Sequence, residues 1–205
     1  MGVNPIACAL LPTPREVGAD VAVGDGQPLG LDTAFGGPYL GFMTATSAMM
    51  RKLPGRIVGQ THDTEGKTGY VLTLSAREQH IRREKASSNI CSNEALCALT
   101  AGLYMATMGP DGMAQAAEQS MAKAHYLEKA LCALPGVEPV YGGAYFHEFV
   151  LKMPRSQELL EALDRRGILG GLPLGDDRVL WCATEKVSRR ELDEAVSIVK
   201  EVLDK

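Results

Sequence analysis

A charged segment that contains several arginines and one histidine is the part of this sequence best suited to chemistry. It runs from Arg77 to Cys91, alternates positive and negative side chains, and leads into a helix-start signal. Its candidate substrate-binding or interface residues are Arg77, His80, Arg82 and Arg83. Because the planar guanidinium of arginine can form two parallel hydrogen bonds with a carboxylate, the segment favours contact with an anionic group or with a partner chain.

A structural interpretation of the same segment stays open beside the functional one. Glu78 and Glu84 are placed to neutralise the arginines, and the resulting network would hold the segment to the helix that follows. For His80 taken singly, a hydrogen-bonded structural role is favoured over proton transfer. The sequence does not decide between the two interpretations.

Two other segments contain candidate binding residues. Arg56 lies between two glycines in the segment 54–59, where contact with a carboxylate, contact with a partner chain and a surface salt bridge are all open. Gly36, Gly37 and Tyr39 belong to a glycine-rich segment that precedes a predicted strand. This composition is typical of a tight turn, and the backbone N–H groups of such a loop are also suited to approach a phosphate.

The bulk composition excludes several classes of function. The chain has 205 residues, 45% of them apolar, which suits one or two compact domains. Its net charge of -4 argues against a nucleic-acid binder, because such proteins usually carry a basic surplus. No apolar run approaches the roughly 20 residues that span a bilayer, so no membrane segment is expected. The first residues do not match a signal peptide.

The cysteines and histidines show no metal-binding pattern along the sequence. The five cysteines are scattered and form no C-x-x-C pair. We therefore expect reduced thiols in a cytoplasmic protein, and no zinc site. His62, His125 and His147 have no ligand spacing with one another, so ordinary polar roles are expected for them.

Residues 1–110 are predicted to form an incomplete α/β domain. Its expected elements are strands over 18–23 and 39–45, a hairpin or extended excursion over 54–75 with a polar turn at 63–66, and a helix over 92–108 that ends at Gly109-Pro110. Leu96, Leu99 and Leu103 share one face of this helix. Two strands do not make a stable α/β sheet alone, so we expect the chain to be a fragment that lacks the preceding part of this domain, with an unusual small domain as the alternative.

Residues 111–205 are predicted to form a long helix and a small α/β domain. A helix of about 20 residues is roughly 30 Å long, which is enough to link two domains. The expected elements are helices over 111–134 and 156–167, strands over 137–141, 145–151 and 179–183, and a final helix. Ser188 and Glu191 form a capping box at the start of the final helix. Its expected buried stripe consists of Leu192, Ala195, Val196, Val199 and Leu203.

The order and spacing of four motifs resemble the glycine-cleavage P-protein family, a pyridoxal-phosphate (PLP) glycine dehydrogenase (decarboxylating). The motifs are Gly18-Ala19-Asp20, Phe35-Gly36-Gly37-Pro38, the segment 54–59 and the segment 77–91. The likeness is closest to subunit 1 of the two-subunit bacterial form, a heterotetramer, and covers only its C-terminal half. It implies an α/β fold: the C-terminal portion of a type I PLP-dependent transferase, with the end of the large domain, a long linking helix and a small C-terminal α/β domain.

The resemblance also implies an activity and partners. The family decarboxylates glycine and passes the aminomethyl group to lipoylated H-protein, and subunit 1 works with subunit 2. In the catalytic half of the family a lysine that forms a Schiff base with PLP follows the Gly-Ala-Asp motif at a fixed interval. The same interval here leads to Pro28, which has no amine, and neither Lys52 nor Lys67 replaces the lysine. The chain is therefore expected to have no catalytic residue of its own.

In this interpretation PLP is bound covalently by the partner subunit, and the fragment alone is inactive. Gly36, Gly37 and Tyr39 would then approach the partner's PLP. The alternative function is that of a structural or assembly module, which covers the partner's apolar interface and adds nothing to the active site. An unpaired sheet edge would also favour self-association of the chain.

Overall fold

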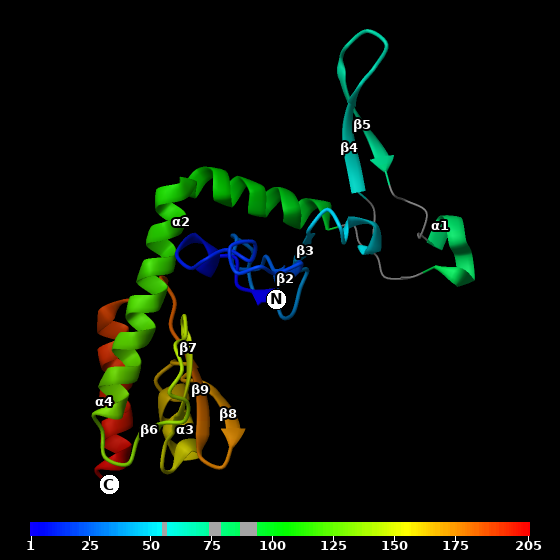
Figure 1. The fold of residues 1–205 in the computed structure, drawn as a ribbon. Helices are drawn as coiled ribbons and strands as arrows, with labels where there is room; N and C mark the ends of the chain where they lie inside the picture. The colour runs from blue at the N-terminus through cyan, green and yellow to red at the C-terminus, as the bar shows by residue number, and fades with distance from the viewer. Residues whose placement is uncertain (55–56, 74–78, 87–93) are drawn as a thin grey trace. The chain divides into compact units, whose positions relative to one another are not determined.

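The computed structural model describes residues 1–54, 57–73, 79–86 and 94–205 (Figure 1). The chain divides into two compact units, Met1–Thr107 and Met108–Lys205. Both units contain helices and strands, so the predicted α/β class is confirmed. None of the helices in these described ranges is long and apolar enough to cross a membrane.

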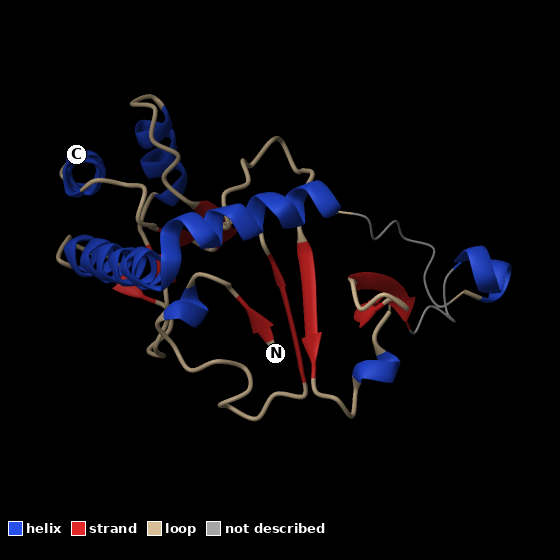
Figure 2. Cartoon of the chain, turned by 90° about the horizontal axis from the view of Figure 1, so that it is seen from above, coloured by secondary structure: helices blue, strands red, loops and turns tan. Residues whose placement is uncertain are grey.

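The first unit contains a three-stranded sheet in the order β1-β2-β3. Its strands are β1 (Gly2–Val3), β2 (Val21–Asp25) and β3 (Gly41–Ala45), and the 3-10 helix η1 (Ala7–Ala9) follows β1. β1 runs parallel to β2, whereas β3 runs antiparallel to it, and Figure 2 shows β2 and β3 side by side. The two predicted strands are thus present, but β1 was not predicted, since a pair of residues carries no periodic pattern.

The predicted hairpin is confirmed as an antiparallel pair, β4 (Ile57–His62) and β5 (Thr68–Thr73). Asp63 Oδ1 accepts hydrogen bonds from the backbone N–H groups of Glu65 and Lys67, each at 2.9 Å. This Asx-type pattern closes the turn at the residues that the sequence marked as polar. The 3-10 helix η2 (Met50–Lys52) precedes the hairpin, and α1 (Gln79–Arg82) and η3 (Arg83–Lys85) follow it.

The helix labelled α2 (Ala95–Cys132) is interrupted at Gly109, whose backbone angles are φ 63° and ψ 179°. The next residue, Pro110, has no backbone N–H and cannot continue the hydrogen-bond pattern of the preceding turn. The predicted end of one helix and start of another at Gly109-Pro110 is therefore confirmed.

The leucines that share one face in the first part of α2 are exposed and do not form a buried core face. Leu96, Leu99 and Leu103 are 76%, 59% and 60% exposed. Cys97 and Ala101 are the buried residues of this segment instead. Helical periodicity identified the shared face correctly, but periodicity alone does not say what covers that face.

The second unit contains a four-stranded antiparallel sheet in the order β6-β7-β9-β8. Its elements are β6 (Glu138–Pro139), β7 (Glu148–Lys152), α3 (Ser156–Asp164), β8 (Leu172–Gly175), β9 (Arg178–Cys182) and α4 (Arg189–Leu203). The capping box of α4 is present, with Ser188 Oγ accepting from the N–H of Glu191 at 3.3 Å. β8 was not predicted, because it contains Pro173 and follows a Gly-Gly pair.

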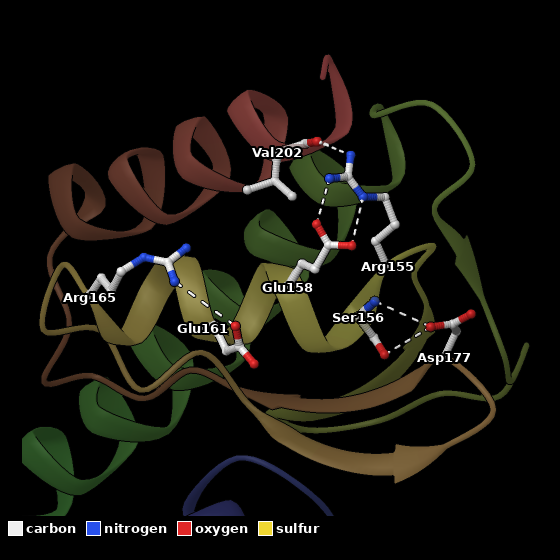
Figure 3. Close-up of polar contacts among 7 residues, drawn as sticks. All are labelled: Arg155, Ser156, Glu158, Glu161, Arg165, Asp177 and Val202. Atoms are coloured by element: carbon white, nitrogen blue, oxygen red, sulfur yellow. Dashed lines mark hydrogen bonds and ion pairs between the residues drawn. The ribbon is translucent and has the colours of Figure 1, made fainter.

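Polar contacts fix the start of α3 (Figure 3). Arg155 forms two hydrogen bonds with the carboxylate of Glu158 and donates a third to the carbonyl of Val202 at 2.6 Å, near the C-terminus of α4. A cation at this end of a helix complements the unpaired carbonyls and the helix dipole. Asp177, from the turn before β9, accepts from both the N–H and the hydroxyl of Ser156. A distant residue thus caps α3.

One apolar core joins the sheet of the second unit to its helices. Its fully buried side chains include Leu131 from α2, Leu151 from β7, Leu163 from α3 and Val199 from α4. In α4 the predicted stripe is confirmed at Leu192, Ala195 and Val199, but Ile198 and Val202 are the other buried positions, whereas Val196 and Leu203 are only partly buried.

Replacing Leu163 by alanine is expected to lower the free energy of unfolding by about 2–5 kcal/mol, because it leaves a cavity in this core. Leu169→Ala is the matched control: Leu169 is 93% exposed, and its truncation should change stability by less than about 0.5 kcal/mol. Denaturant unfolding measures both values. Equal effects of the two substitutions would contradict the described core.

Candidate functional site

A cavity of about 310 Å³ lies at the carboxyl ends of the two parallel strands of the first unit. Val3 and Asn4, at the end of β1, form one side of it, and Asp25 and Gln27, at the end of β2, form another. In open α/β sheets, ligands bind outside the carboxyl ends of the strands. The position of this cavity makes it the candidate site.

Two glycines allow the elements around this cavity to approach closely. A Cβ atom on Gly24 would lie 2.5 Å from the Val3 carbonyl oxygen, and one on Gly26 would lie 2.8 Å from Leu40 Cδ2. Gly26 also donates its N–H to the carbonyl of Leu40 at 2.6 Å, just beyond the paired residues of β2 and β3. These close contacts bring the segment before β3 to the end of β2.

The glycine-rich loop 33–39 enters the site at this point. Tyr39 lines the cavity, and its hydroxyl donates a hydrogen bond to the carbonyl of Thr33 at 2.7 Å. The N–H of Gly36 also donates a hydrogen bond to the carbonyl of Thr33, at 3.0 Å. Both ends of the loop are therefore fixed, while its tip faces solvent: Phe35 is fully exposed, and no other atom lies within 4 Å of a Cβ built on Gly36.

The backbone of the loop tip has an unusual conformation. Ala34, Phe35, Gly36 and Gly37 all have φ between 37° and 148°, in the region that favours glycine. Non-glycine residues in this region cost energy, and such conformations are concentrated in ligand-binding and switch segments. The loop is thus a formed structure with a protruding aromatic side chain.

Pro28, the residue at the expected lysine position, lines the same cavity as Tyr39. The turn that contains it is fixed by Asp25 Oδ1, which accepts from Gln27 N–H at 2.8 Å, and by the Gln27 side chain, which donates to the Leu31 carbonyl at 2.7 Å. Pro28 and Tyr39 belong to different motifs of the sequence, and the structure brings both to the same cavity.

The residues of this site do not fit a covalent PLP anchor. A Schiff base needs a lysine amine, and no lysine is among the residues that line the cavity. Lys52 is exposed in η2, and the ammonium of Lys67 pairs with Glu65 at 2.7 Å in the hairpin turn. The polar residues Asn4, Asp25 and Gln27 are among those that line the cavity instead, and no sequence pattern selected them.

The other predicted site residues lie in or near the charged segment. Arg56 and Arg77 fall outside the described residues. His80 lies within α1, whereas Arg82 ends that helix and Arg83 begins η3, and both arginine side chains are exposed. Arg83 has φ 52°, which changes the course of the chain between the two short helices. Their roles in binding stay predictions.

The start of the first unit also contains a larger cavity, of about 500 Å³, at the opposite end of β2. The motif residues Gly18, Ala19 and Asp20 line it, together with Arg15. Gly18 has φ 78°, so the chain turns there before the strand begins. The Gly18-Ala19-Asp20 motif thus forms the turn that leads into β2. The candidate site lies at the other end of this strand.

Comparison with known proteins identifies the family. The family model described as "Glycine cleavage system P-protein" matches residues 1–199. A probable glycine dehydrogenase (decarboxylating) subunit 1 from Moorella thermoacetica is 52% identical over 98% of this chain and 47% of its own length. One of the same description from Oleidesulfovibrio alaskensis is 49% identical over 97% of this chain and 46% of its own length. The chain therefore spans about half the length of the relatives it matches.

The solved structures confirm the fold. A glycine decarboxylase (P-protein) of the glycine cleavage system, in inhibitor-bound form, matches with a TM-score of 0.91 and 42% identity over 98% of this chain and 47% of that one. A NifS-like protein from Rickettsia africae matches with a TM-score of 0.62 at 16% identity, over 99% of this chain and 52% of its own. The fold is that of the type I PLP-dependent enzymes. This chain belongs to the glycine cleavage system P-protein family.

Proposed function

We propose that this chain is the C-terminal part of subunit 1 of a glycine dehydrogenase (decarboxylating). The whole enzyme would decarboxylate glycine and transfer the aminomethyl group to lipoylated H-protein. The observation that carries the proposal is the identity of about one half with relatives described as that subunit. The absence of a lysine from the described cavity then limits what this chain contributes.

Subunit 2 is proposed to hold PLP covalently, while this chain completes the pocket from outside. The loop 33–39 supports this division of roles, because hydrogen bonds to the Thr33 carbonyl close the loop and its Phe35 side chain is fully exposed. Exposed aromatic side chains on formed loops are typical anchors of protein interfaces. Gly36, Gly37 and Tyr39 would then contact the partner's PLP or its phosphate.

A second proposal, an assembly module without any contact to the active site, is favoured by a different observation. Leu96, Leu99 and Leu103 form an exposed apolar face in the first part of α2, which suits burial against other protein. The two functions differ in what a substitution in loop 33–39 should do to an assembled complex.

The reconstituted enzyme tests the proposed activity. Full-length subunit 1, subunit 2, PLP and lipoylated H-protein together are expected to exchange the glycine carboxyl group with labelled bicarbonate. Either subunit alone should show at most about one hundredth of that rate, since the pocket is then incomplete. Exchange by subunit 1 alone, or an undiminished rate for subunit 2 alone, would contradict the proposal.

Gly37→Val separates the two functions. At φ 148° a valine is strained, and its side chain would change the tip of the loop, although only Tyr39 N lies within 4 Å of the added Cβ. We expect PLP affinity of the assembled complex to fall about tenfold, which is about 1.4 kcal/mol. Fluorescence titration of PLP measures the affinity, and size-exclusion chromatography measures assembly.

Gly66→Ala is the matched control for this variant. Gly66 also has a positive φ, 78°, and open space around its Cβ position, but it lies in the hairpin turn. Its substitution should leave PLP affinity unchanged. If Gly37→Val assembles and binds PLP as tightly as the unsubstituted complex, loop 33–39 does not contact the cofactor and the assembly function is supported.

A further inference from the structure

Three side chains with different metal-ligating atoms meet in the second unit. His147, Glu148 and Cys182 place an imidazole nitrogen, a carboxylate oxygen and a thiol sulfur all within 4.8 Å of one another. His147 and Glu148 are separated from Cys182 by the 33 residues 149–181, so sequence spacing gave no sign of this group. The cluster belongs to the second unit, shares no residue with the proposed function and does not depend on it.

Strand pairing builds the cluster. Glu148, the first residue of β7, is directly opposite Cys182, the last residue of β9, in the antiparallel pair. Residues opposite each other point to the same face of a sheet. The next pair, Phe149 and Trp181, points to the other face and is buried in the core at 5% and 2% exposure. The core therefore fixes the face on which Glu148 and Cys182 lie.

A bend in the chain brings the third ligand to the same place. His147 precedes β7 in a bend, so it does not follow the alternation that would turn its side chain away from Glu148. Its carbonyl accepts a hydrogen bond from the N–H of Ala183 at 3.2 Å, which holds the bend beside the end of β9. Backbone contacts thus position all three residues before any ion binds.

The carboxylates of Glu148 and Glu185 favour positive charge beside His147 and Cys182, whereas burial disfavours charge there. Partial burial, followed by the charges of Glu148 and Glu185, raises the pKa of the Cys182 thiol to about 11. Burial lowers the pKa of His147, while the same two carboxylates act in the opposite direction. The neutral imidazole is the form that binds metals. The ammonium of Lys123 donates a hydrogen bond to the backbone carbonyl of Glu185 at 2.6 Å.

The ligand set selects the type of ion. Nitrogen and sulfur ligands with one carboxylate are typical of zinc, whereas calcium and magnesium prefer oxygen ligands alone. With zinc–ligand bonds of about 2.0–2.3 Å, tetrahedral ligand atoms lie about 3.5 Å apart. Glu148 and Cys182 are residues at strand ends with solvent-accessible surface, although the Cys182 thiol is partly buried, so small rotations of their side chains can close the remaining distance.

We propose that His147, Glu148 and Cys182 form a three-ligand site for zinc or a chemically similar divalent cation, with water as the fourth ligand. Binding displaces the proton of the Cys182 thiol, which is released to solvent, and the thiolate sulfur bonds to the metal. The ion joins the bend before β7 to the end of β9. Because the unfolded chain does not bring these residues together, the ion stabilises the folded second unit.

Cobalt(II) tests the site directly, because a cobalt–thiolate bond gives a near-ultraviolet charge-transfer band and four-coordinate cobalt gives intense visible bands. Metal-free protein titrated with Co²⁺ is expected to develop both, and one equivalent of Zn²⁺ should remove them. Cys182→Ser should abolish the charge-transfer band. His147→Gln and Glu148→Gln should each weaken Co²⁺ binding at least tenfold.

Cys132→Ser is the matched control, because Cys132 is also a partly buried thiol close to a carboxylate, Glu128. It should keep the cobalt spectrum and the rise in unfolding temperature on adding Zn²⁺, and Cys182→Ser should lose both while its circular dichroism stays native-like. A charge-transfer band that survives in Cys182→Ser, or no band in the unsubstituted protein, overturns the proposal.

Discussion

The parallel pairing of β1 with β2 is the interaction on which the candidate site depends. It places Val3 beside Gly24, so that the ends of both strands open into the same cavity. The pairing tolerates no side chain at Gly24, where a Cβ would meet both the Val3 carbonyl and the ring of Phe42. A short strand and one glycine therefore determine where Pro28 and Tyr39 lie, and that position decides what the chain can bind.

The second unit is stabilised by a continuous apolar core between an antiparallel sheet and its helices. Because the core fixes the alternation of β7 and β9, the outward-facing ends of these strands form a rigid surface. The first unit presents a loop with strained backbone and an exposed aromatic side chain, whereas the second presents fixed polar side chains. The two units thus differ in how local packing presents their candidate binding residues.

Local signals made much of the fold predictable. The break at Gly109-Pro110, the turn at Asp63 and the capping box at Ser188 each depend on residues within a few positions, so the sequence alone located them. β1 escaped prediction because pairing with β2, a strand distant in sequence, and not local preference makes it extended. β8 pairs with the adjacent strand β9, but its Pro173 and the preceding Gly-Gly pair concealed it. The meeting of Pro28 with Tyr39, and of His147 with Cys182, is likewise a product of strand pairing.

We propose that this chain, with Pro28 at the expected lysine position, does not hold PLP covalently. Borohydride reduction of the assembled, PLP-loaded complex, followed by peptide mass spectrometry, tests it most directly, since reduction fixes the cofactor to whichever lysine holds it. We expect a pyridoxyl-lysine peptide from subunit 2 and none from this chain. A pyridoxyl group on Lys52, Lys67 or any other lysine of this chain would contradict it.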